Sequence, residues 1–140
     1  MKVAVVYWSS TGNTEAMAQA VVEGAKHAGA EAELFTAAEF DGGKMDEFDA
    51  VAFGCPAMGA EELEDGEFAP MFETCESKLS GKKIALFGSY GWGDGEWMRS
   101  WEKDCADAGV NLVCDSVICC EAPDDAVLES LRAMGKTLAS

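Results

Sequence analysis

Basic residues are scarce in this chain of 140 residues, which has 10 lysines and arginines against 26 aspartates and glutamates and a formal net charge of −16. This shortage argues against nucleic acid and anionic membranes as partners, because both carry negative charge themselves. It favours partners with basic protein surfaces, since opposite charge speeds their encounter. The acidic balance is also compatible with a role in solubility alone, and charge does not separate the two interpretations.

The chain also lacks the usual signs of a metal centre, of secretion and of a membrane span. It has a single histidine, and none of its six cysteines forms a C-x-x-C pair. A metal site is therefore disfavoured, and we expect the cysteines to be reduced and to pack as small hydrophobes. No apolar run is long enough to span a bilayer, and Met1-Lys2-Val3 leads into a predicted strand rather than a signal peptide. These features predict one soluble, cytoplasmic domain over residues 1–140.

The segment Trp8-Ser9-Ser10-Thr11-Gly12-Asn13-Thr14 joins a predicted buried strand, residues 3–7, to a helix predicted from apolar spacing between Met17 and Ala25. The first N–H groups of a helix lack partners within it, and the helix dipole adds positive charge, so this turn suits a phosphate. Its hydroxyls add donors, and Gly12 lets the backbone approach closely. No lysine or arginine lies in the turn, which argues against a nucleotide-hydrolysing P-loop. Ordinary N-capping of the helix is the alternative interpretation.

Strands and helices alternate along the rest of the chain. The pattern predicts further strands at residues 31–36, 49–54, 84–87 and 111–120. It predicts helices that begin between Glu67 and Pro70, near Trp97 and at residues 123–125, and a short helix or turn in residues 37–47 with Gly42-Gly43 as breakers. The helical spacing of Trp97 and Trp101 favours core packing for both rings. Five strands that alternate with helices indicate a parallel sheet covered on both faces, in which ligands bind at the carboxyl ends of the strands.

Three unusual loops follow the first, third and fourth strands and should therefore share that edge of the sheet. The second loop carries Met58, Gly59 and an acidic run, and the third places Tyr90 and Trp92 among glycines. Aromatic rings in a glycine-rich loop have no core to pack into and suit a planar ligand; the alternative is that Trp92 folds back onto its own sheet. A planar ring with a phosphate tail describes a mononucleotide or flavin mononucleotide (FMN). The lack of an Asn or Gln near Trp92 to recognise a base edge mildly favours the flavin.

These loops resemble those of flavodoxins. Ser9-Ser10-Thr11-Gly12-Asn13-Thr14 is similar to the flavodoxin phosphate loop, Ser/Thr-x-Thr-Gly-x-Thr. Residues 56–62, Pro-Ala-Met-Gly-Ala-Glu-Glu, and residues 88–93, Gly-Ser-Tyr-Gly-Trp-Gly, resemble the two flavin-flanking loops of short-chain, clostridial-type flavodoxins. The similarity covers the whole chain, in order and with suitable spacing. It implies a flavodoxin-like three-layer α/β/α sandwich with a five-stranded parallel sheet of strand order 2-1-3-4-5, and FMN as the cofactor.

The resemblance also assigns the cofactor-binding residues. They are Trp8, Ser9, Ser10, Thr11, Gly12, Asn13 and Thr14 in the first loop, Pro56, Ala57, Met58, Gly59, Ala60 and Glu61 in the second, and Ser89, Tyr90, Gly91, Trp92 and Gly93 in the third. It implies that Trp92 stacks on the outer face of the flavin, that Met58 covers the inner face, and that Tyr90 lies beside the ring. Glu61 would accept a hydrogen bond from flavin N3–H, and the Met58-Gly59 peptide would turn its carbonyl toward N5 after one-electron reduction.

Two positions near the ribityl chain stay open. Pro56 stands where similar proteins offer a hydroxyl, so that contact is in doubt, and Glu121 after the fifth strand is a further candidate. The adjacent Cys119-Cys120 pair lies close to the expected site, where strand packing is favoured over a redox dithiol.

The function implied by the resemblance is a low-potential one-electron carrier, not an enzyme, that shuttles electrons between redox proteins through the semiquinone/hydroquinone couple of FMN. Its partners would be basic-surfaced reductases and oxidoreductases, and the carrier would be a monomer that binds neither nucleic acid nor membrane. Nearby carboxylates would disfavour the anionic hydroquinone and hold the second reduction at low potential. The carboxylates expected around the ring are Glu61, Glu62, Glu64, Asp65, Asp94 and Glu96.

Two other functions are weaker candidates. An FMN-dependent NAD(P)H oxidoreductase would bring its dinucleotide against these carboxylates without a nearby arginine. A phosphoryl-accepting receiver of similar architecture is disfavoured because the third strand ends in Gly54-Cys55 rather than in an aspartate.

Overall fold

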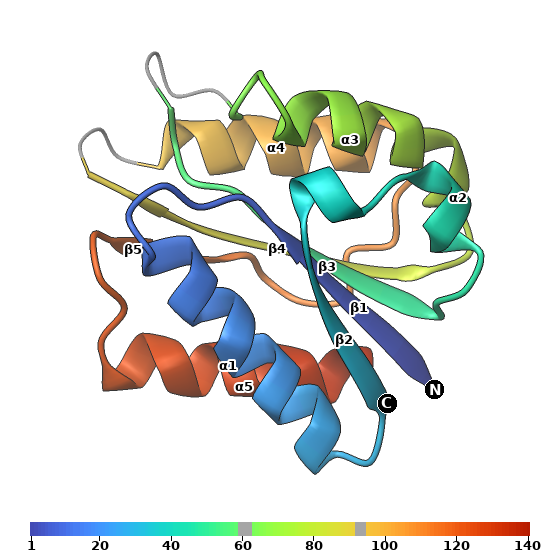
Figure 1. The fold of residues 1–140 in the computed structure, drawn as a ribbon, viewed down its shortest axis with the longest axis horizontal. Coiled ribbons are helices and arrows are strands. Elements are labelled where there is room, and N and C mark those ends of the chain that lie inside the picture. Colours follow the sequence, from blue (N-terminus) through green and yellow to red (C-terminus); the bar gives the residue numbers. More distant parts are fainter. Residues whose placement is uncertain (59–62, 92–94) are drawn as a thin grey trace.

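The computed structural model describes residues 1–58, 63–91 and 95–140, which form a parallel sheet between two layers of helices (Figure 1). The strands are β1 (Lys2–Tyr7), β2 (Glu31–Thr36), β3 (Ala50–Gly54), β4 (Lys83–Tyr90) and β5 (Val117–Cys120). The helices are α1 (Asn13–His27), α2 (Gly42–Met45), α3 (Phe68–Cys75), α4 (Glu96–Asp107) and α5 (Asp125–Leu138), with short 3₁₀ turns η1 (Ala37–Glu39) and η2 (Glu76–Lys78). The strands lie in the order β2-β1-β3-β4-β5, which confirms the predicted fold class and strand order.

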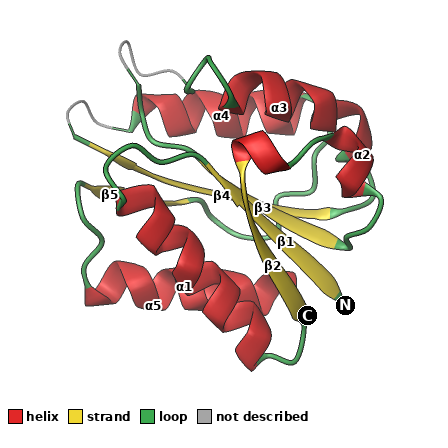
Figure 2. Ribbon diagram, in the orientation of Figure 1, coloured by secondary structure: helices red, strands yellow, loops and turns green. Residues whose placement is uncertain are grey.

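Each face of the sheet packs against its own helices. Helices α1 and α5 cover one face, and α2, α3 and α4 cover the other (Figure 2). The buried cluster on the α3/α4 face includes Phe53, Phe68 and Trp101, and the cluster on the α1/α5 face includes Met17 and Leu131. Because both faces are covered, the central strand β3 is buried at every residue, as its continuous apolar sequence requires. Trp97 and Trp101 are only 2% and 3% exposed, which confirms that both rings pack in the core.

The pairing register brings the ends of the strands to one edge. Tyr7 at the end of β1 is paired with Gly54 at the end of β3, and Gly54 is paired with Phe87 of β4. The loops that follow β1 and β3 therefore leave the sheet at the same level.

Strand β4 is longer than its apolar run predicts. The prediction ended the strand at Phe87 and assigned the next residues to a loop, but β4 continues to Tyr90, which is paired with Cys120 of β5. Gly88 makes this continuation possible, because a Cβ at that position would lie 2.1 Å from the carbonyl oxygen of Cys55. Ser89 and Tyr90 therefore approach the site from a strand rather than from a loop.

Strand β5 is shorter than predicted, since residues 111–120 were expected to form one strand. An isolated bridge joins Leu112 to Ile84, and the continuous strand then covers only residues 117–120. Between them the chain leaves the sheet, and the hydroxyl of Ser116 donates to the carboxylate of Glu102 at 2.7 Å. In this part of the segment a side-chain hydrogen bond to α4 thus takes the place of backbone hydrogen bonds to β4.

The two glycines expected to break structure after β2 instead begin α2. The Asp41 side chain accepts a hydrogen bond from the N–H of Lys44 at 3.2 Å and so caps this short helix. A Cβ on Gly42 would lie 2.2 Å from the carbonyl oxygen of Thr74, so glycine is required here for close packing rather than for chain reversal. Across the described ranges, no helix has the length and apolar character needed to cross a membrane.

Candidate functional site

A cavity of about 500 Å³ opens at the carboxyl edge of the sheet, within the size range of small-molecule sites. It is lined by residues from four loops or strand ends: Ser10, Thr11 and Asn13; Pro56, Ala57 and Met58; Ser89, Tyr90 and Gly91; and Glu121 with Ala122. The structure thus brings members of all three predicted groups to one place.

Other predicted site residues lie elsewhere. Trp8, Ser9 and Gly12 line a neighbouring cavity of about 320 Å³, together with residues at the end of β2, and Ser10 lines both cavities. Thr14 is buried beneath the first loop. Gly59, Ala60, Glu61, Trp92 and Gly93 lie outside the described residues, and so does the predicted turn of the Met58-Gly59 peptide.

The start of α1 has no side-chain cap. Its N-cap residue is Gly12, which has a left-handed backbone (φ 92°) that suits glycine, and no side chain bonds to the first turn from this position. Among the described residues, no hydrogen bond joins the N–H of Thr14 or Glu15 to a protein acceptor. By contrast, α5 is capped by Asp124, which accepts from the N–H of Val127 at 2.9 Å. The open amides of α1, with the exposed hydroxyls of Ser10 and Thr11 nearby, make a donor set suited to an anion.

A buried hydroxyl pair connects the first loop to β4. The hydroxyls of Thr14 and Ser89 lie 3.0 Å apart, and the two residues are 1% and 5% exposed. Thr14 therefore uses its hydroxyl to fix the beginning of α1 against the sheet.

Trp8 anchors the first loop to two other elements. Its backbone N–H donates to the carbonyl oxygen of Gly54 at 3.0 Å, and its indole N–H donates to Oε1 of Glu67, also at 3.0 Å. The same loop is thus tied to the end of β3 and to the residue before α3.

Glu64 is a buried carboxylate at the far end of the second loop. It accepts hydrogen bonds from the N–H groups of Gly66, Glu67 and Phe68, at 2.6, 2.8 and 2.8 Å. Burial opposes the charged form, but these three bonds outweigh it and hold the pKa of Glu64 below its ordinary value of 4.5. The carboxylate supplies acceptors to the first turn of α3, where the chain leaves the site.

The other carboxylates expected around the ring divide into two groups. Asp65 is exposed, and Glu96 is exposed and lies 3.6 Å from the guanidinium of Arg99. Glu61, Glu62 and Asp94 lie outside the described ranges.

Tyr90 and Glu121 form the side of the cavity nearest β5. The ring of Tyr90 packs against Trp97 with centroids 5.5 Å apart, and the carbonyl of Tyr90 accepts the N–H of Glu121 at 2.7 Å. Glu121 has a positive φ of 61°, which is unusual for a residue with a side chain. Glu121, named from the sequence as a further candidate near the ribityl chain, lines the cavity, and so does Ala122, for which the sequence carries no signal.

The two thiols of the Cys119-Cys120 pair differ in burial. Successive residues of a strand face opposite sides of the sheet, so Cys119 is buried while Cys120 is exposed. Burial raises the pKa of Cys119 to about 11, and its thiol lies 3.6 Å from the sulfur of Met17. Strand packing is the role that this geometry supports.

The residues that line this cavity are chemically of two kinds. Ser10, Thr11 and Asn13 bring polar groups from the start of α1, and Met58 and Tyr90 contribute apolar and aromatic surface. A ligand with an anionic tail and a flat ring matches this donor set, and FMN has both parts.

Comparison with known proteins identifies the family. A family model described as Flavodoxin matches residues 5–134. The chain is 46% identical to a flavodoxin of Megasphaera elsdenii over 127 residues, which cover 89% of this chain and 90% of that protein. It is 40% identical to a flavodoxin of Clostridium beijerinckii over 136 residues, which cover 97% and 98% of the two chains.

Solved structures agree with the sequence matches. The solution structure of two-electron reduced Megasphaera elsdenii flavodoxin superposes with a TM-score of 0.89 at 43% identity, with 98% of each chain covered. A flavodoxin from the domain Archaea superposes with a TM-score of 0.85 at 28% identity, over 99% of this chain and 96% of that one. The chain therefore belongs to the flavodoxin family of FMN-binding electron-transfer proteins, which are not enzymes.

Proposed function

We propose that this protein carries single electrons between redox proteins by cycling bound FMN between its one-electron-reduced and two-electron-reduced forms. When bound, FMN supplies the redox chemistry, because it accepts and releases electrons one at a time. The protein binds the cofactor, orients it and sets the charge around it. The observation that carries this proposal is the cavity of about 500 Å³ at which the predicted loops meet.

We assign the phosphate of FMN to the start of α1. The first turn of α1 has no side-chain cap, and Ser10, Thr11 and Asn13 at the start of this helix line the cavity. None of the described residues that line this cavity is a lysine or an arginine. The phosphate therefore keeps its negative charge, and that charge opposes the addition of further negative charge to the ring.

We assign the flavin ring to the part of the cavity that Met58 and Tyr90 line, with Met58 on its inner face and Tyr90 beside it. The remaining contacts are assigned from the motifs alone: Trp92 on the outer face, Glu61 at N3, and the Met58-Gly59 peptide as a backbone switch next to N5. Ala57, Ser89 and Gly91 also line the cavity, as do Pro56 and Glu121, which we place beside the ribityl chain.

The charge of the molecule favours basic redox proteins as partners. The net charge of −16 supports attraction to reductases and oxidoreductases with basic surfaces and opposes self-association. We therefore propose a monomeric carrier, a single domain over residues 1–140, that works in the cytoplasm.

An FMN-dependent NAD(P)H oxidoreductase is not favoured. A dinucleotide would bring its negative charge against the acidic residues expected around the ring, and no lysine or arginine among the described lining residues of the cavity offsets that repulsion. An assay of NADH and NADPH oxidation by the FMN-loaded protein, without a reductase, separates the two functions, because a carrier should show negligible turnover.

Stepwise anaerobic reduction tests the carrier function directly. The absorption spectrum of the FMN-loaded protein should pass from yellow through a blue species at half reduction and then to a bleached form, with the second step at lower potential. Two-electron bleaching without the blue species, or steady NADPH oxidation, would contradict the proposal.

A further inference from the structure

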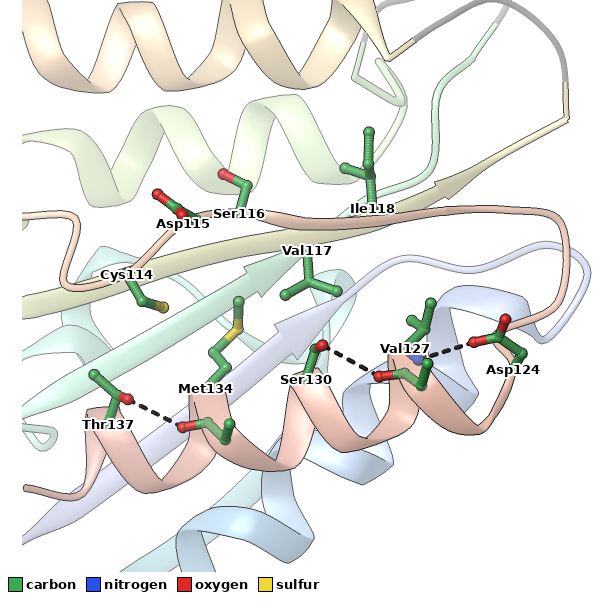
Figure 3. Close-up of a pocket in the computed structure, with 12 residues that line it drawn as sticks. Cys114, Asp115, Ser116, Val117, Ile118, Asp124, Val127, Ser130, Met134 and Thr137 are labelled. Carbon is green, nitrogen blue, oxygen red and sulfur yellow. Dashed lines mark hydrogen bonds between the residues drawn. The ribbon is translucent and has the colours of Figure 1, made fainter.

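A second cavity, of about 650 Å³, lies between β5 and α5 and shares no lining residue with the FMN cavity (Figure 3). Val117 of β5 faces Val127 and Met134 of α5 across it, which gives the cavity an apolar floor. The hydroxyls of Ser130 and Thr137 are turned to carbonyl oxygens of their own helix, at 3.1 and 3.0 Å. The helix side of the groove therefore presents mainly carbon to an incoming chain.

The strand side of the groove is a free edge of the sheet. Strand β5 is last in the order β2-β1-β3-β4-β5, so it has a neighbour on one side only. The N–H of Glu121 and, before the strand, the N–H of Val113 both donate toward β4, to Tyr90 and Ile84. Because alternate residues of a strand direct their backbone groups to opposite sides, the N–H and C=O of Ile118 and Cys120 face the open edge. Such unpaired groups are a template for another strand.

The electrostatics of the groove select the kind of chain that fits. Asp115 and Asp124 are exposed side chains that line the cavity, and the carboxylate of Glu102 lies 2.7 Å from the Ser116 hydroxyl. No lysine or arginine occurs among the lining residues that the structure describes. A second copy of the chain, with its own net charge of −16, is a poor occupant of this acidic edge.

We propose that this groove binds an extended, basic segment of a partner protein, which adds to β5 as a further strand. Its backbone pairs with Ile118 and Cys120, its apolar side chains enter the space between Val117 and α5, and its lysines or arginines meet Asp115 and Asp124. Backbone pairing supplies affinity in this mode of recognition, and the alternate side chains supply selectivity. The site is separate from the FMN loops, so a docked segment leaves the flavin edge open to the body of the same partner.

A short peptide tests the proposal. The probe is a fluorescent, end-blocked hexapeptide of sequence Val-Lys-Val-Arg-Val-Lys, titrated into FMN-loaded protein while anisotropy is measured. Its control is the same peptide N-methylated at every residue, which keeps the charge and the side chains but removes every backbone N–H that could donate to β5. We expect saturable binding of the first peptide, loss of binding for the second, and NMR amide shifts concentrated in residues 113–120. Equal binding of the two peptides, or shifts centred on the FMN loops, would overturn the proposal.

Two double variants test the role of charge. The rim variant, Asp115→Asn with Asp124→Asn, removes the charges of the two carboxylates that line the groove. Asparagine at residue 124 retains an oxygen that can cap α5. The matched control, Glu47→Gln with Glu73→Gln, removes the same charge from exposed positions outside the groove. We expect the rim variant to bind the peptide about tenfold more weakly and the control to change binding less than about twofold, since exposed ion pairs act locally. The visible spectrum of bound FMN should be unchanged in both.

Two results would reject the proposal. An equal loss of peptide binding in both variants would show only general electrostatic attraction. A dimer whose amides at β5 are protected from exchange would show that a second copy of the chain occupies the groove.

Discussion

Single side chains connect the site loops to one another. The Thr14 and Ser89 hydroxyls, 3.0 Å apart, join the first loop to β4, and the Trp8 indole joins the same loop to Glu67. At the other end of the second loop, the Glu64 carboxylate accepts three backbone N–H groups. The Thr14–Ser89 pair and the Glu64 carboxylate are buried, so losing one of their partners costs more than losing an exposed hydrogen bond such as that between Trp8 and Glu67.

Glu64 provides a prediction with a defined pH dependence. Its pKa is lowered in the folded protein, so the ionised form stabilises the fold above the ordinary value of 4.5, and this contribution is lost as the pH falls through the lowered pKa. Glu64→Gln should therefore lower the free energy of unfolding by roughly 1–3 kcal/mol near pH 7. The difference from the unmodified protein should shrink only as the pH falls through the lowered pKa of Glu64, because both proteins then carry a neutral side chain.

Urea unfolding of the apoproteins at several pH values measures this difference. Glu73→Gln is the matched control, because Glu73 is an exposed residue of α3, the helix whose first turn donates to Glu64. A loss for Glu64→Gln that is the same at all pH values would mean that ionisation of this carboxylate does not matter.

Helices α1 and α5 illustrate how elements fit together. Their backbones approach so closely that a Cβ on Gly24 would lie 2.0 Å from the carbonyl oxygen of Arg132, and one on Gly135 would lie 2.2 Å from that of Val21. Both glycines lie inside helices, where alanine is normally the better residue by about 1 kcal/mol. Close packing of the helix pair therefore overrides local helix preference.

Gly135→Ala should consequently destabilise the fold, by roughly 1–3 kcal/mol, because the added methyl group forces the helices apart. Thermal or urea unfolding of the apoprotein measures the effect. Ser130→Ala, at an exposed position of the same helix, serves as the comparison and should be neutral or slightly stabilising. A stabilised Gly135→Ala protein would mean that the two helices can separate without cost.

At the scale of the whole molecule, the net negative charge should raise the rate at which this protein associates with basic partner proteins. Reduced protein should transfer electrons to a basic c-type cytochrome roughly tenfold more slowly at about 300 mM salt than at about 10 mM, because salt screens long-range attraction. Stopped-flow absorbance measures the rate. An uncharged quinone serves as the control acceptor, whose rate should hardly change with salt. Salt-independent transfer to the cytochrome would remove the charge argument for basic partners.

Periodic and local patterns in the sequence were sufficient for much of the architecture. Apolar runs and helical spacing identified the five strands and the main helices, and glycine and hydroxyl residues marked the turn before α1. The rule that ligands bind at the carboxyl edge then predicted that three distant loops would meet, as Ser10, Met58 and Tyr90 do around one cavity. The flavodoxin resemblance supplied the strand order and the cofactor.

Contacts between distant residues were beyond such patterns. Glu64 belonged to an acidic run and was expected near the ring, but it turns inward because the amides of α3 need acceptors. The sequence predicted a glycine-rich loop at residues 88–90, yet these residues complete β4 because β5 pairs with them. Residues 114–116, predicted as part of a strand, leave the sheet.

The turn from Trp8 to Thr14 contains both kinds of information. Its composition was enough to indicate an anion site, because open amides and hydroxyls at a helix start are local properties. The sequence did not predict how this turn is held in place, because its hydrogen-bond partners Gly54, Glu67 and Ser89 come from three other parts of the chain. Local chemistry follows from neighbouring residues, whereas the geometry of a site depends on segments that only folding brings together.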